Sequence, residues 1–303
     1  YMALAGLLEI SGQADTLPPL VGFQGADIVG SLQAVVGIQA ALLEKARTGK
    51  GQFVDVSLCE SAMILGISSL SQGLAGGLVD RGTGHLDGGL PNYNIYETSD
   101  GKYLSVGALE PHFWAKFCKF VKAEHMIKAS TEEVKTFIAT KTYDEWVSLS
   151  KECDACIEPI LGVSELTSHP QHVARGVFLH PSPLSAATPP PPPQMVLGPR
   201  LSNHSPRLLG RAAYHGEHNK EILEALERND QEDELFVDSS TDADNVTTSE
   251  VPRSPLYGVK VLDLSRLLPG PLTTHMLVRL GAEVVKIEAP DGDYARFVPP
   301  LIK

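Results

Sequence analysis

The sequence predicts an α/β protein, and two stretches carry that prediction. In residues 30–46 the apolar side chains recur at helical spacing, a Gly-Lys-Gly turn follows, and residues 53–58 alternate as a β-branched strand does. Residues 257–288 have the pattern strand, helix, strand. Such a unit opens a parallel sheet with helical cover, which indicates the α/β class.

The C-terminal pattern divides into clear parts. Residues 259–264 are nearly all apolar, so we expect a strand that is covered on both faces. A Pro-Gly-Pro turn leads into a helix over 272–280, and residues 283–288 form the second strand. The stretch contains no G-x-G-x-x-G, so it carries no dinucleotide fingerprint.

Asp27 stands just ahead of the N-terminal helix, in the stretch GADIVG. An aspartate at that position can cap the helix, because it accepts backbone N–H bonds and suits the positive end of the dipole. It can equally be a carboxylate held in a cleft as a base or nucleophile. The local sequence leaves both interpretations open.

The central part of the chain predicts a helix, a loop and a hairpin. Residues 59–78 are apolar and rich in small side chains, which favours a buried helix. A glycine-rich loop spans 80–92. Residues 93–98 and 102–107 alternate around a Ser-Asp-Gly turn, so they form a β-hairpin.

Glu110 precedes a proline at the start of a predicted helix over 112–121. Proline fits the first helical turn and an acid suits the dipole there, so Glu110 also has a plain structural interpretation. Two amphipathic helices are predicted over 131–140 and 143–152, and a short strand over 157–160. A further helix begins over 164–167, and His169-Pro170 would break it.

Composition limits the function classes. The 303 residues are 43% hydrophobic with a net charge of −12, which argues against a nucleic-acid partner. The four cysteines include one C-x-x-C without the further ligands of a zinc site, so we expect no metal and a reducing, intracellular compartment. No apolar run reaches the roughly 18 residues of a membrane span. Residues 227–252 are acidic and polar, which predicts a disordered linker.

Three stretches resemble the family III CoA-transferases (CaiB/BaiF), and in particular the α-methylacyl-CoA racemase branch. They are ADIVGSLQAVVGIQAALLEKARTGKGQFVDVSL, LDGGLPNYNIYETSDGKYLSVGALEPHFW and DACIEPILGVSEL. The C-terminal GVKVLDLSRLLPGP, GAEVVKIEAP and GDYAR resemble the family's amino-terminal opening. The resemblance therefore places the beginning of the family pattern at the end of this chain.

The resemblance implies a fold and an organisation. We expect a Rossmann-like large domain with a mostly parallel sheet, a smaller α+β domain, and an interlocked homodimer. The implied parts are a large-domain core, a small domain, a return segment that includes five prolines, the acidic linker, and the opening of a second or permuted copy; they span 1–85, 86–185, 186–226, 227–252 and 253–303.

The resemblance also implies site residues. Asp27 matches the family's catalytic aspartate, and Glu110 matches the racemases' GA-x-EP-x-F glutamate, which would orient a histidine that acts as the second acid/base. That histidine would precede Tyr1, in an H-D-I-N-Y motif. Many relatives have an arginine after the K-I-E strand for the CoA nucleotide; here Ala289 stands there, so phosphate contacts would fall to Lys286 or Arg296.

These features favour racemisation of 2-methylacyl-CoA thioesters, with no cofactor beyond the CoA of the substrate. One alternative is a family III CoA-transferase, in which Asp27 attacks the thioester and becomes an aspartyl-CoA carrier. Another is an inactive fragment that only dimerises. The order of the motifs fits either a piece of a tandem fusion or a circular permutant. We expect the tandem piece, because a permutant should still contain the family's H-D-I-N segment between GDYAR and Tyr1. In a eukaryote such a soluble protein would act in mitochondria or peroxisomes, and otherwise in the cytoplasm.

Overall fold

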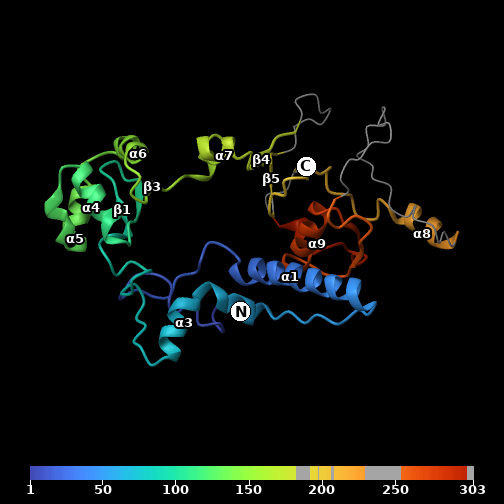
Figure 1. Cartoon of the computed structure of the whole chain (residues 1–303). Coiled ribbons are helices and arrows are strands. Elements are labelled where there is room, and N and C mark those ends of the chain that lie inside the picture. Colours follow the sequence, from blue (N-terminus) through green and yellow to red (C-terminus); the bar gives the residue numbers. More distant parts are fainter. Residues whose placement is uncertain (182–191, 197, 206–207, 229–253, 299–303) are drawn as a thin grey trace. The chain divides into compact units, whose positions relative to one another are not determined.

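The computed structural model describes residues 1–181, 192–196, 198–205, 208–228 and 254–298. Its fold is mixed α/β, with a three-stranded sheet and two two-stranded sheets. The chain forms two compact units (Figure 1). Unit 1 comprises Tyr1–Ala26 and Ser57–Leu166, and unit 2 comprises Asp27–Val56 and the described residues from Thr167 onward. The five-part division expected from the sequence stays a prediction.

Unit 1 contains an antiparallel sheet in the order β1-β2-β3, with α4, α5 and α6 gathered around it in Figure 1. Tyr96 pairs with Leu104 across the hairpin, and Val106 pairs with Ile157 on the third strand. This confirms the predicted hairpin and helices. The bounds are β1 Tyr93–Glu97, β2 Tyr103–Gly107, α4 Pro111–Phe120, η2 Glu124–Lys128, α5 Thr131–Ile138, α6 Tyr143–Glu152, β3 Ile157–Pro159 and η3 Val163–Glu165.

Two tryptophans organise the core of unit 1. Trp146 is 1% exposed, and its indole N–H donates to the carbonyl of Ile138 at 2.9 Å. The Trp114 indole donates to the carbonyl of Met126 at 3.2 Å. Both rings contact Phe117, at centroid distances of 5.5 Å and 5.9 Å. Both rings are thus buried with their N–H groups satisfied, in a core cluster that includes residues of all three strands and of α4, α5 and α6.

The stretch from residue 53 to residue 74 departs from two predictions. Residues 53–58 form no strand: Phe53 is 89% exposed, no described strand pairs with the segment, and Ser57 instead caps α2 (Leu58–Met63). The apolar stretch that follows breaks into α2, η1 Ile64–Gly66 and α3 Ile67–Leu74, and α3 buries none of its residues. Both predictions assumed neighbours that the described residues do not supply, because a strand needs a hydrogen-bonded partner and a buried helix needs cover.

Unit 2 contains the predicted strand–helix–strand. β6 (Lys260–Asp263) and β7 (Glu283–Lys286) pair in parallel around α9 (Pro269–Arg279). The long helix α1 (Gly25–Thr48) packs against this layer, as Figure 1 shows. The shared core contains Val35, Leu256, Met276, Leu277 and Ala282. The prediction that this strand is covered on both faces was wrong, because Leu262 in β6 is 63% exposed.

The remaining described elements are short. The helical turn η3 ends before His169, whose backbone is extended, as the predicted break requires. Pro170 then begins a new helix, since proline is compatible with the first helical position. The bounds are α7 Pro170–Ala174, β4 Phe178–Leu179, β5 Gln194–Met195, α8 Asn219–Glu227 and η4 Tyr294–Phe297. The predicted linker, apart from its first two residues, and most of the proline run lie outside the described residues.

Within the described ranges, α1 alone has the length and apolar composition that could cross a membrane. An 18-residue stretch of this helix has a mean hydropathy of 1.6, and 22% of the stretch is buried. Core helices of soluble proteins pass the same test, so the expectation that the chain has no membrane span stays a prediction.

Candidate active site

Asp27 lies in the first turn of α1 and is partly buried. The helix begins at Gly25, two residues earlier, so Asp27 does not stand ahead of the helix where an N-cap would be. Its carboxylate accepts no hydrogen bond from any described residue. The capping interpretation therefore loses its geometric basis, and the carboxylate is available to a ligand.

Two hydroxyl groups fix the backbone around Asp27. Ser31 is 1% exposed, and its Oγ lies 2.7 Å from the carbonyl oxygens of both Asp27 and Pro269. Thr273 Oγ1 donates to the Pro269 carbonyl at 2.8 Å and lies 3.4 Å from the Ser31 carbonyl. These contacts join the first turn of α1 to the first turn of α9, so a well-packed backbone carries the Asp27 side chain.

Glu110 is the N-cap residue of α4, and its side chain is exposed. Its backbone carbonyl accepts the N–H of Phe113 at 3.0 Å, whereas its carboxylate makes no capping bond. The main chain and Pro111 thus begin the helix, and the acid is not needed for that task. As with Asp27, the Glu110 carboxylate has no partner among the described residues.

Asn92 is a supporting residue that the sequence did not single out. Its side-chain amide donates to the carbonyls of Ala108 at 2.7 Å and Leu109 at 3.3 Å. These are the two residues immediately before Glu110, so Asn92 anchors the turn that presents the glutamate. It belongs to the L-P-N-Y part of the second motif, and its amide in a loop was the only available signal.

Lys286 and Arg296 are brought into one cluster in unit 2, and each is paired with a carboxylate. Lys286 Nζ forms an ion pair with Asp293 and donates to the Ser265 carbonyl at 3.2 Å. Arg296 binds Glu288 through two bonds of 2.7 Å and 2.9 Å. A phosphate at either cation would have to compete with these carboxylates, and both residues stay predictions as CoA contacts.

The cluster shifts the titration of its acids. The Arg296 guanidinium holds the pKa of Glu288 below its usual range. Burial alone would raise the pKa of Asp293, but bonds from Lys286 and from the backbone N–H groups of Ala295 and Leu267 outweigh burial and lower it to about 2. Both acids are therefore ionised at neutral pH, which keeps the pairs intact.

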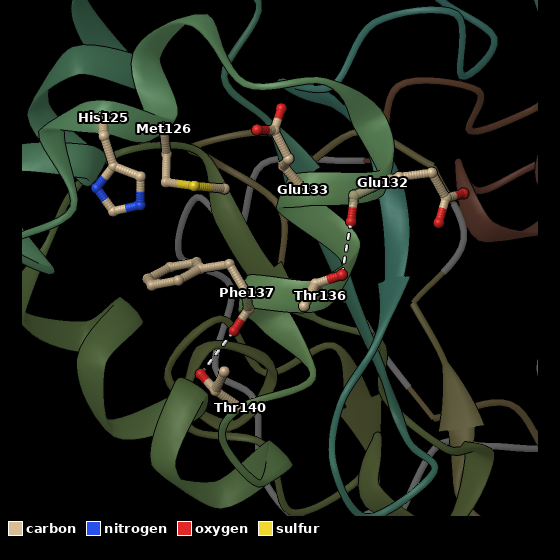
Figure 2. A pocket seen from close by; sticks show the side chains of 7 residues that line it. All are labelled: His125, Met126, Glu132, Glu133, Thr136, Phe137 and Thr140. Atoms are coloured by element: carbon tan, nitrogen blue, oxygen red, sulfur yellow. Dashed lines mark hydrogen bonds between the residues drawn. The ribbon is translucent and has the colours of Figure 1, made fainter.

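Asp27 belongs to unit 2 and Glu110 to unit 1, and each is described within its own unit. A surface groove of about 460 Å³ lies elsewhere, on α5 and η2, and contains neither residue (Figure 2). Glu133 in its wall is already engaged by the N-cap residue Ser130, and the Thr136 hydroxyl by its own helix. The groove therefore lacks the chemistry that the motifs predict.

Comparison with known proteins agrees with the motifs. The sequence model of CoA-transferase family III matches residues 1–219 and 256–303. Over 240 residues the chain is 32% identical to human α-methylacyl-CoA racemase, covering 74% of this chain and 60% of the racemase. It is 26% identical over 253 residues to mouse succinyl-CoA:glutarate CoA-transferase, covering 76% of this chain and 55% of that protein.

Solved structures show the same fold. A CaiB/BaiF family protein from Brucella suis matches 74% of this chain and 61% of its own, with a TM-score of 0.59 and 22% identity. A Mycobacterium tuberculosis protein matches 72% of this chain and 60% of its own, with a TM-score of 0.57 and 18% identity. The chain spans about 60% of the length of these relatives, and it belongs to CoA-transferase family III.

Proposed function

We propose that this chain contributes to the racemisation of 2-methylacyl-CoA thioesters. The observation that carries the proposal is Glu110 in a racemase-type GA-x-EP-x-F motif, presented on an anchored turn with its carboxylate unengaged among the described residues. The greater identity to racemases than to the transferase, 32% against 26%, points the same way.

The chemistry requires proton transfer on both faces of one carbon. A thioester makes the neighbouring C–H weakly acidic, so a base can remove that proton to leave an enolate, and an acid on the opposite face returns a proton with inversion. Asp27 is proposed as the acid/base of one face. A histidine of the family's H-D-I-N-Y pattern would serve the other face, and Glu110 would orient that histidine.

The large domain is proposed to be Rossmann-like, and the assembly a homodimer. The parallel β6–β7 pair around α9 supports the first part, because parallel strands with helical crossovers are the unit of such sheets. The exposed apolar side chains of α1 support the second, since they offer surface for a partner to cover. They are Leu32, Val36 and Leu43.

The second candidate is CoA transfer, which the match to succinyl-CoA:glutarate CoA-transferase favours. In that reaction the Asp27 carboxylate would attack the thioester carbonyl and expel the CoA thiolate, which leaves an acyl-aspartyl anhydride. The thiolate would then attack the aspartyl carbonyl and release the donor acid, so that the enzyme carries an aspartyl-CoA thioester to the acceptor acid. A carboxylate without hydrogen-bond partners among the described residues suits a nucleophile as well as a base. The two reactions differ in whether the hydrogen on the α-carbon is removed and returned.

The test substitutes Asp27 in the full-length protein and follows inversion of a 2-methylacyl-CoA. We expect Asp27→Asn to lower kcat by roughly 10²–10⁴-fold with folding retained, because the amide cannot exchange the proton. Asp55→Asn is the matched control, since Asp55 is an exposed carboxylate in the same unit. Unfolding of both Asp27→Asn and Asp27→Ala would make the residue structural and refute its proposed role.

A further inference from the structure

The loop that joins β6 to α9 contains an unfavourable backbone conformation. Leu267 has a φ of +63°, in the left-handed region that residues with a side chain rarely adopt. Leucine gains nothing locally from that geometry, because it has no short polar side chain to bond its own backbone. Contacts from elsewhere in the fold must therefore impose the conformation.

Asp293 supplies these contacts. It is 4% exposed, and its two carboxylate oxygens accept the Leu267 N–H at 3.1 Å and 3.3 Å. The same carboxylate pairs with Lys286, whose Nζ donates to the Ser265 carbonyl at 3.2 Å. Asp293 thus holds the loop at two points, Leu267 directly and Ser265 through the lysine.

A second buried carboxylate fixes the beginning of the loop. Asp263 is 3% exposed, and its Oδ1 accepts both the backbone N–H at 2.8 Å and the hydroxyl of Ser265. Its Oδ2 accepts the Thr274 hydroxyl at 2.7 Å. Asp263 acts on Ser265 and α9, whereas among the described residues Asp293 alone accepts the Leu267 N–H. The left-handed residue is therefore the part of the loop that Asp293 controls.

The loop lies where α/β proteins bind ligands. It follows the carboxyl end of β6 beside the parallel strand β7, and it leads into the first turn of α9. We propose that Asp293 is a positioning residue: it keeps Leu267 left-handed, so that residues 264–268 are preorganised for the CoA part of the substrate. This proposal rests on the proposed function, because that function supplies the ligand.

The proposal differs from the expectation that Lys286 is itself a phosphate contact. In the structure the Lys286 ammonium group forms an ion pair with Asp293 and a hydrogen bond with the Ser265 carbonyl. Its positive charge is therefore already paired within the protein. Lys286 therefore bridges the Asp293 carboxylate and the Ser265 carbonyl. A ligand then meets a loop of fixed shape, which lowers the ordering cost of binding.

The experiment compares three variants of the full chain. Asp293→Asn keeps the shape of the side chain and removes the charge, and Asp291→Asn is the control, since Asp291 is exposed two residues away. Leu267→Gly, combined with Asp293→Asn, lets the loop be left-handed without help, because glycine adopts positive φ freely. The readouts are amide hydrogen exchange of residues 264–268 and the Kd for free CoA by calorimetry.

We expect Asp293→Asn to speed exchange at the Leu267 amide and to weaken CoA binding by roughly tenfold or more, because hydrogen bonds to a charged group are lost. Asp291→Asn should change neither readout. Adding Leu267→Gly should restore a large part of the CoA affinity, which a direct contact between Asp293 and the ligand would not allow.

Two outcomes overturn the proposal. Unchanged exchange in 264–268 after Asp293→Asn would show that the aspartate does not hold the loop. Failure of Leu267→Gly to recover any affinity would show that backbone conformation is not what Asp293 supplies. If the unsubstituted chain binds no CoA while Asp293→Asn still speeds exchange, the loop is held by Asp293 but not for CoA, and the CoA assignment of the proposed function fails separately.

Discussion

The three-stranded sheet of unit 1 and the β6–β7 sheet of unit 2 differ in what surrounds their side chains. In unit 1, Leu104 and Val106 are almost fully buried beneath helices that carry both tryptophans. In unit 2, Leu262 faces outward, while Asp263 and Asp293 are buried. The first sheet is held by apolar packing, whereas the second has one buried carboxylate at the end of β6 and another in the segment that follows β7.

The difference separates stability from binding. Apolar packing of Ala108, together with the neutral amide of Asn92, fixes the turn before Glu110 without placing a charge there. Buried carboxylates need hydrogen-bond partners, and they impose conformations such as that of Leu267 that packing alone would not select. We therefore expect substitutions in the first sheet to act on folding, and substitutions at the strand ends of the second to act on loop order and affinity.

The largest expected effect is on the packing of unit 1. Trp146→Ala should cost about 3–5 kcal/mol of the unfolding free energy of unit 1, because it empties a site that is 1% exposed and removes the shorter of the two hydrogen bonds to the Ile138 carbonyl. The loss of unfolding free energy is measured by urea titration, with hydrogen exchange of β1 and β2 as the readout of unfolding. Ile95→Ala is the control, since Ile95 is exposed on the same sheet. Equal effects of the two substitutions would contradict the described core.

The same contrast explains what the sequence could predict. The hairpin, α4, α5 and α6 follow from local patterns, because alternation, capping residues and helical spacing lie within each segment. The failed strand over 53–58 and the exposed helix α3 are decided by neighbours, and a pattern of apolar residues does not say whether those neighbours exist.

The site was predictable only in part, for the same reason. Asp27 and Glu110 belong to long motifs, so a resemblance could propose them as site residues. The bond between Asp293 and the Leu267 N–H joins residues 26 positions apart, and the bond between Ser31 and Pro269 joins residues 238 positions apart. Neither pairing leaves a local signal, and the pairing of Lys286 and Arg296 with carboxylates was missed likewise.

The next effect concerns acid stability in unit 2. The pKa of Asp293 is about 2 in the fold against an ordinary 3.8, so its ionised form stabilises the folded state by about 2 kcal/mol above pH 4. Because the folded pKa is the lower one, this contribution is lost as the pH falls from about 4 to about 2. The protection of β6 and β7 from hydrogen exchange should be measured in the unsubstituted protein and in Asp293→Asn, at pH 6 and at pH 2.5. We expect the difference in protection between the two proteins to be smaller at pH 2.5. A difference independent of pH would argue against the ion pair.

A smaller effect should distinguish capping from packing within unit 1. Ser130 caps α5 and shares a capping box with Glu133, so Ser130→Ala should cost about 1 kcal/mol of unfolding free energy. Ser148→Ala is the control, because that hydroxyl bonds only a carbonyl of its own helix and its loss should change the free energy by less than about 0.5 kcal/mol. Urea titration of both variants decides the comparison, and an equal loss in the two would remove the capping role.

The decisive functional measurement follows the α-carbon of a 2-methylacyl-CoA in D₂O with the full-length protein. Racemisation through an enolate must exchange that hydrogen, whereas CoA transfer leaves the C–H intact and accumulates an aspartyl thioester that hydroxylamine traps. We predict deuterium at the α-carbon, no trapped adduct on Asp27, and inefficient inversion in Glu110→Gln. A trapped adduct without exchange would contradict the racemase assignment and place the protein among the transferases of the family.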